Sequence, residues 1–96
     1  MKLRLKYPLQ LEKKMVEELT FRDYTTADDY LAFDIRGGVA QNITLIANLT
    51  GTDEVLIKRL RGPDYKAACQ IVDKIFDRDD KEFMGMEDAE KKSSES

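Results

Sequence analysis

The sequence predicts an α+β fold in which an N-terminal antiparallel β-hairpin packs on a small bundle of three to four α-helices. Apolar residues recur at every second position up to about residue 22, which is the period of a strand. Beyond that point they recur at steps of three and four, which is the period of a helix. The length of 96 residues fits one domain, expected at residues 1–78, with a disordered, flexible acidic tail at residues 79–96.

Two segments predict the hairpin. Residues 2–7 alternate lysine or arginine with Leu3, Leu5 and Tyr7, and Pro8 suits the end or the edge of this strand because it has no N–H to donate. Residues 15–22 form the second strand, and the polar residues 12–14 form the turn. A hairpin alone is only marginally stable in water, so helices must cover its apolar face.

The first predicted helix begins at Thr25 or Thr26, since threonine is a good N-cap and Asp28 and Asp29 follow in the first turn. The consecutive glycines at 37 and 38 end it. We expect its inward face to consist of its apolar residues, namely Ala27, Tyr30, Leu31 and Ile35.

Three further helices follow. The first covers about residues 39–50 and ends at Gly51, where a left-handed turn favours glycine. Thr52 or Asp53 then caps a short helix over residues 54–60. Gly62-Pro63-Asp64 opens the last helix, because proline loses no hydrogen bond there. Its apolar face is Tyr65, Ala68, Cys69, Val72, Ile75 and Phe76.

The charge is concentrated at one end of the chain. Residues 77–96 carry eight acidic and four basic residues, whereas the other 76 residues carry 11 acidic and 12 basic ones. Without a clustered basic face, binding to nucleic acid is not expected. No apolar run is long enough for a membrane span or a signal peptide. Together with the single Cys69, this favours a reducing cytoplasm.

The sequence lacks the residue types and spacings that catalytic and metal sites require. The chain has no histidine, the usual general base and the commonest metal ligand. Cys69 falls on an apolar helix face, where a thiol is normally structural. The aspartates at 77, 79 and 80 do not open a calcium loop, because its sixth position would be Glu82 instead of glycine and its twelfth Asp88 instead of glutamate. We therefore expect no enzyme, no catalytic residue, no cofactor and no metal site.

Three stretches resemble the small phage tail assembly chaperones of Mu-like and related prophages: ELTFRDYTTADDYLA at 18–32, LIANLTG at 45–51 and LRGPDYKA at 60–67. Their order and spacing agree with the family over residues 3 to about 76. The family often has Pro-Thr after the arginine of the second strand, whereas this chain has Arg22-Asp23-Tyr24-Thr25. This departure puts the local turn in doubt.

The resemblance implies a non-enzymatic role in which the protein binds the tape measure protein and keeps it soluble during tail morphogenesis. It also implies that a longer, frameshifted form recruits the tail tube protein. The paired codons of Lys91 and Lys92 are candidates for the slippage, or else two ordinary charges of the tail. Self-association would help to stabilise so small a core. The alternative is a small prophage regulatory or antitoxin-like module that binds protein without catalysis.

One short apolar cluster lies within the predicted tail. Phe83, Met84 and Met86 surround Gly85 and are the candidate partner-binding residues, since methionine adapts to varied apolar surfaces. The alternative is a chance cluster in a disordered segment.

Overall fold

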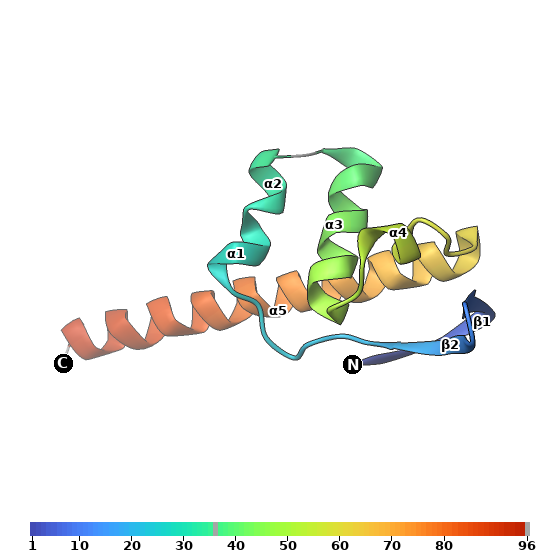
Figure 1. Cartoon of the computed structure of the whole chain (residues 1–96). Helices are drawn as coiled ribbons and strands as arrows, with labels where there is room; N and C mark the ends of the chain where they lie inside the picture. The colour runs from blue at the N-terminus through green and yellow to red at the C-terminus, as the bar shows by residue number, and fades with distance from the viewer. Residues whose placement is uncertain (36, 96) are drawn as a thin grey trace.

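The computed structural model describes residues 1–35 and 37–95, with the side chains of Ile35 and of residues 88–95 outside that description. A hairpin comes first, and helices follow it (Figure 1). The elements are β1 (Lys2–Leu11), β2 (Lys14–Thr20), α1 (Ala27–Tyr30), α2 (Ala32–Ile35), α3 (Gly38–Thr50), α4 (Glu54–Ile57) and α5 (Gly62–Glu95). The predicted α+β fold with an N-terminal antiparallel hairpin is confirmed.

The two strands of the hairpin pair antiparallel, with Leu3 opposite Leu19 and Leu9 opposite Val16. The first strand is longer than predicted, because it continues past Pro8 to Leu11. It does so through an irregularity between Arg4 and Leu9, where the register shifts. Proline is tolerated there because the irregular segment requires no N–H donation to the neighbouring strand.

The irregular part of β1 is held by the last helix. The backbone N–H groups of Lys6 and Tyr7 each donate a hydrogen bond of 2.9 Å to the carboxylate of Asp64. Asp64 lies in the first turn of α5 and is only 4% exposed. Its side chain therefore replaces β2 as the acceptor for this stretch of β1, and it fixes the hairpin to α5.

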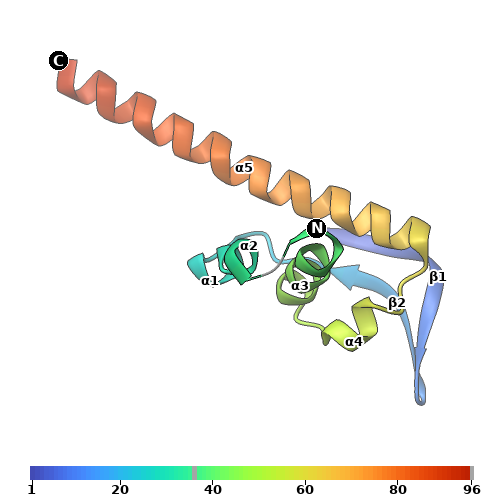
Figure 2. The same cartoon turned by 90° about the horizontal axis from the view of Figure 1, so that it is seen from above.

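The core lies between the hairpin, α3, α4 and the first half of α5. Its residues alternate along the strands and repeat at helical spacing along the helices, as the periodicity predicted. α5 passes over the hairpin and α3 (Figure 2), and both elements contact it. The most deeply buried large side chains are Phe21, Leu45, Ile46, Leu49, Ile57 and Ile75.

The predicted helix after residue 25 is present as two consecutive short helices, α1 and α2, with Thr26 as its N-cap. The prediction of its inward face was wrong for Ala27 and Leu31, whereas Tyr30, although partly exposed, packs its ring against Phe76 of α5. Tyr30 and Leu31 are 42% and 49% exposed and Ala27 is also exposed, whereas Asp29 and Ala32 are buried. The side chain of Ile35 lies outside the described residues. An acidic residue occupies an inward position because Arg22 neutralises it, as described below.

The helix ends in the middle of the chain follow the predicted caps. α3 ends at Gly51, whose φ of 63° is the left-handed conformation that favours glycine. The side chain of Asp53 accepts a hydrogen bond of 2.9 Å from the N–H of Val55 and so caps α4. α4 is shorter than predicted, and it buries Leu56 and Ile57 while Val55 faces solvent.

The last helix begins at Gly62 as predicted, but it continues through Glu95. The backbone of residues 79–95 is therefore helical, and the flexibility predicted for the tail at residues 79–96 stays a prediction. The physical reason is that a helix already nucleated against the core extends with one hydrogen bond per residue, and charged residues such as glutamate and lysine are good helix formers. The second half of α5 extends beyond the other elements (Figures 1 and 2).

The folding unit is expected to end close to Asp80, slightly beyond the predicted boundary at residue 78. Asp79 accepts hydrogen bonds from Thr25 and from the hydroxyl of Tyr30, the latter at 2.7 Å, so it ties α1 to α5. Beyond it, Lys81 pairs with Asp77 across one turn of α5, and Phe83, Met84 and Met86 are exposed. Among the side-chain interactions that the structure describes, this exposed pair is the one that removal of the later residues would break, and such a pair contributes about 0.3–0.5 kcal/mol.

Truncation after Asp80 should consequently leave the melting temperature within about 2–3 °C of that of the full chain. The substitution Asp79→Ala in the full chain is the matched comparison, because it removes both hydrogen bonds to α1. It should lower the melting temperature by about 4–8 °C, which corresponds to roughly 1 kcal/mol for a domain of this size. Thermal unfolding followed by circular dichroism measures both, and a large loss on truncation would show that the later residues are part of the folding unit.

Candidate functional site

Two of the three stretches that carry the family resemblance, residues 18–32 and 45–51, meet in space around Arg22. Its guanidinium donates two hydrogen bonds to the carboxylate of Asp29, at 2.8 and 3.1 Å. It also donates to the backbone carbonyls of Tyr24 and Asn48, each at 3.2 Å. The backbone N–H of Arg22 donates to the carbonyl of Leu49 at 2.9 Å. One residue therefore joins the end of β2, the start of α1 and the end of α3.

Asp29 is almost fully buried, and its carboxylate accepts hydrogen bonds from two different residues. Besides Arg22, the backbone N–H of Thr26 donates to its carboxylate at 2.9 Å, which completes a capping box at the start of α1. Burial by itself raises the pKa of Asp29, but the hydrogen bonds from Arg22 and Thr26 and the charge of Arg22 outweigh burial. The pKa of Asp29 is accordingly lowered, and this carboxylate stays charged.

The third stretch, at residues 60–67, contains Asp64, which holds β1 as described above. Arg22, Asp29 and Asp64 are therefore engaged within the fold. Their contacts fix elements that are distant in sequence, and this is a structural role. The surface available to a partner must lie elsewhere.

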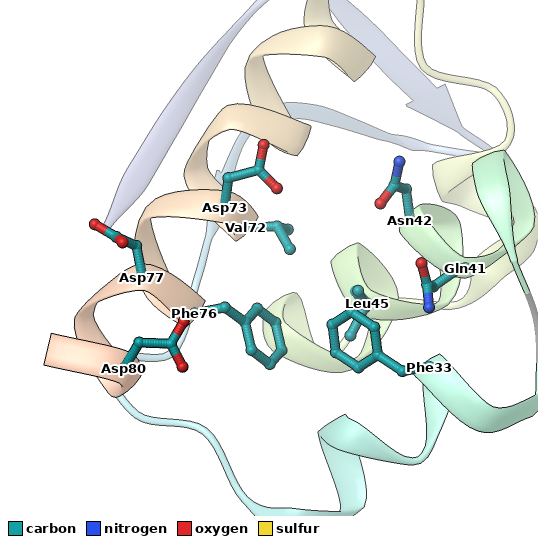
Figure 3. Close-up of a pocket in the computed structure, with 9 residues that line it drawn as sticks. All are labelled: Phe33, Gln41, Asn42, Leu45, Val72, Asp73, Phe76, Asp77 and Asp80. Carbon is teal, nitrogen blue, oxygen red and sulfur yellow. The ribbon is translucent and has the colours of Figure 1, made fainter. Parts of the chain in front are cut away.

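An open groove lies between α3 and α5, with a volume of about 370 Å³ (Figure 3). Leu45 and Val72 form its floor, and the rings of Phe33 and Phe76 face one another at one end. α5 supplies one wall with Asp73, Asp77 and Asp80, and α3 supplies the other with Gln41 and Asn42.

Three aromatic rings fix the end of the groove. Phe76 packs edge-to-face against Tyr30 and Phe33, with ring centroids 5.0 and 5.3 Å apart, and Tyr30 lies 5.9 Å from Phe33. Burial and the hydrogen bond to Asp79 raise the pKa of Tyr30 to about 12, so its hydroxyl remains a donor at neutral pH. Phe33 is still 46% exposed, and its ring therefore offers apolar surface at the mouth of the groove.

A family model described as phage tail assembly chaperone proteins E, 41 or 14 matches residues 2–77. This chain belongs to the phage tail assembly chaperone family. Comparison with curated proteins and comparison with solved structures each gave no match. The family match includes every motif that carried the sequence resemblance, and it favours a chaperone over the regulatory or antitoxin-like alternative.

The three residues predicted to bind a partner lie on α5 of the chaperone, beyond the end of the family match. Phe83, Met84 and Met86 are 57%, 60% and 60% exposed, as a docking element requires. The structure does not bring them together on a single face. Phe83 and Met84 follow Phe76 and Asp77 by seven residues, which places them on the groove side of α5. Met86 follows Asp79 by seven residues and lies toward the α1 side.

The groove of the chaperone was not predicted from the sequence. Its residues come from α2, α3 and α5, and no short motif links them. The one available signal was the repetition of aspartate at 73, 77 and 80, which is the spacing of one helix face.

Cys69 of the chaperone packs partly buried against the core, as expected of a structural thiol. Burial raises its pKa, so the reactive thiolate is scarce at neutral pH. Among the described residues, no group of three histidine, cysteine, aspartate or glutamate side chains has the arrangement of a metal site. Within the same residues, no helix is long and apolar enough to cross a membrane.

Proposed function

We propose that this chaperone binds the tape measure protein in the bacterial cytoplasm and keeps it soluble until tail tube subunits assemble around it. Family membership supports a tail protein as the partner. The observation that carries the proposal is that large apolar side chains, among them Phe33, Phe83 and Met84, stay exposed along α2 and α5. Surfaces of this kind bind other apolar surfaces.

The proposed task requires binding and no bond chemistry. A long helical protein exposes apolar stripes before its assembly, and these stripes aggregate unless another protein covers them. The bound chaperone must also be displaced when the tube forms, and a small binding surface of moderate affinity allows this displacement. We therefore propose that the chaperone acts without catalysis and without a cofactor.

A longer form would add a second partner. We propose that slippage at the codons of Lys91 and Lys92 appends an extension that recruits the tail tube protein. Both residues lie within the helical range of α5, so the extension would continue from the end of this helix.

Co-expression tests the main proposal. The tape measure protein from the same tail gene cluster is produced with and without the tagged full-length chaperone, and its soluble fraction is measured after centrifugation. We expect it to be soluble and to co-purify only when the chaperone is present. An equal soluble fraction in both cultures, with no co-purification, would contradict the proposal.

The exposed side chains of α5 give a second test. Changing Phe83, Met84 and Met86 together to serine should weaken binding of the tape measure protein by about tenfold or more, because each buried apolar side chain contributes about 1 kcal/mol or more. The side chains are exposed, so the melting temperature of the free chaperone should not change. Unaltered affinity of the triple variant would remove these residues from the binding surface.

A further inference from the structure

The groove between α3 and α5 has an apolar base and one charged wall. Leu45 and Val72 are buried at its floor, and the partly exposed ring of Phe33 stands at its end against Phe76. A groove of this kind takes an amphipathic helix, which inserts apolar side chains at spacings of three and four residues.

The acidic wall comes from one face of α5. Asp73, Asp77 and Asp80 are separated by four and three residues on α5, and all three line the groove. Figure 3 shows that Asp73 and Asp80 lie nearer to the groove, whereas the carboxylate of Asp77 points to the outer side of the helix. Among the side chains that the structure describes, the ion pair of this wall is that between Asp77 and Lys81, at 3.1 Å. The opposite wall is uncharged, since Gln41 and Asn42 are amides. The groove thus presents negative charge on one side only.

The same face continues beyond the groove. Phe83 lies on the same side of α5 as Phe76, and Met84 lies on the same side as Asp77, each two helical turns later. Both side chains are exposed. Groove and extension follow one another along α5, separated by the charged residues 77–82, and we call the two together the acidic groove strip. It comprises Phe33, Leu45, Val72, Asp73, Phe76, Asp77, Asp80, Phe83 and Met84.

We infer that the acidic groove strip is the docking site for a helix of the tape measure protein whose apolar ridge is flanked on one side by lysine or arginine. The inference rests on the proposed function and adds the surface and the chemistry of the bound segment. Charge complementarity identifies the occupant, because basic side chains beside the apolar ridge would meet Asp73, Asp77 and Asp80. A second copy of α5 would instead bring its own acidic strip against this one, and the like charges would repel.

The test uses the full-length chaperone and synthetic peptides of about 25 residues, or seven helical turns, that tile the tape measure protein. Fluorescence anisotropy gives their affinities. One variant carries D73K, D77K and D80K. Its control carries E12K, E17K and E82K, which change the net charge equally at exposed positions, with Glu82 on the same helix away from the groove. A third variant carries D73N, D77N and D80N. It removes the negative charges without adding positive ones, so it still tests the groove if the first variant fails to fold.

We expect the tightest peptides to be amphipathic and basic along one edge. The D73K, D77K and D80K variant should bind them at least about tenfold more weakly, and the control should change affinity by less than about twofold. The affinity of the asparagine variant should lie between those of the unchanged chaperone and the lysine variant. Affinity of the unchanged chaperone should fall as salt rises from about 0.05 to 0.5 M. Phe83→Ser should weaken binding more than Met86→Ser, because only Phe83 lies on the strip.

Three outcomes would overturn the inference. Equal losses of peptide affinity in the D73K, D77K and D80K variant and in its control would show that net charge alone matters. Tight peptide binding by the unchanged chaperone would in that case still support the proposed function. Binding by neutral or acidic peptides, insensitive to salt, would assign a different chemistry. A dimer of the chaperone alone that the groove variant dissociates, seen by analytical ultracentrifugation, would assign the strip to a second copy.

Discussion

Replacing Asp29 with alanine is expected to lower the free energy of unfolding by about 2–3 kcal/mol, because it removes a buried carboxylate that pairs with a partly exposed guanidinium. Asp29 is 2% exposed and accepts hydrogen bonds from both Arg22 and the N–H of Thr26. Its loss leaves the guanidinium without its counterion and α1 without its cap. Urea unfolding followed by circular dichroism measures the effect.

The adjacent substitution Asp28→Ala is the matched control, since Asp28 lies in the same helical turn but is exposed. It should cost less than about 0.5 kcal/mol. Arg22→Lys should give an intermediate loss, because lysine keeps the charge but cannot donate the paired hydrogen bonds of a guanidinium. Similar losses for Asp28→Ala and Asp29→Ala would contradict the role of the buried pair.

The same pair has a defined pH dependence. The pKa of Asp29 is lowered in the folded state, so its stabilising contribution is fully present above the unfolded value of about 3.9 and is lost as pH falls through the folded value. The difference in stability between the unchanged chaperone and Asp29→Ala should therefore stay constant between about pH 5 and 8 and shrink below about pH 4.

Replacing Asp64 with alanine should lower the free energy of unfolding by about 2–3 kcal/mol, because two backbone N–H groups of β1 lose a charged acceptor. The carboxylate receives both hydrogen bonds at 2.9 Å and is buried between β1 and α5. Asp64→Asn should cost roughly half as much, since one side-chain oxygen remains to accept. Asp73→Ala, an exposed change on the same helix, serves as the control.

Amide hydrogen exchange tests whether Asp64 stabilises one particular stretch of β1 or only the whole fold. In the unchanged protein the amides of Lys6 and Tyr7 should exchange slowly, although they do not pair with β2. In Asp64→Ala they should exchange faster than the amides of Leu3 and Leu9, where the hairpin stays paired. If all four amides accelerate equally, Asp64 supports global stability only and does not hold this stretch of the strand.

The sequence by itself determined the succession of elements and most of their ends. Alternation before residue 22 and helical spacing after it gave the hairpin and the helices, and Thr26, Gly51 and Asp53 are at the caps that their side chains or backbone favour. These features are local, since each depends on residues within one or two turns of each other. The buried face of α5 was also visible, because its apolar residues repeat over many turns.

The tertiary structure alone decided where charged groups are buried and where partner surface remains. Asp29 faces inward because Arg22 reaches it from β2, and Asp64 is buried because β1, 57 and 58 residues away, supplies its donors. The groove likewise forms from α2, α3 and α5. Periodicity places an acidic residue on the solvent side by default, and only a partner outside the helix itself can reverse that assignment.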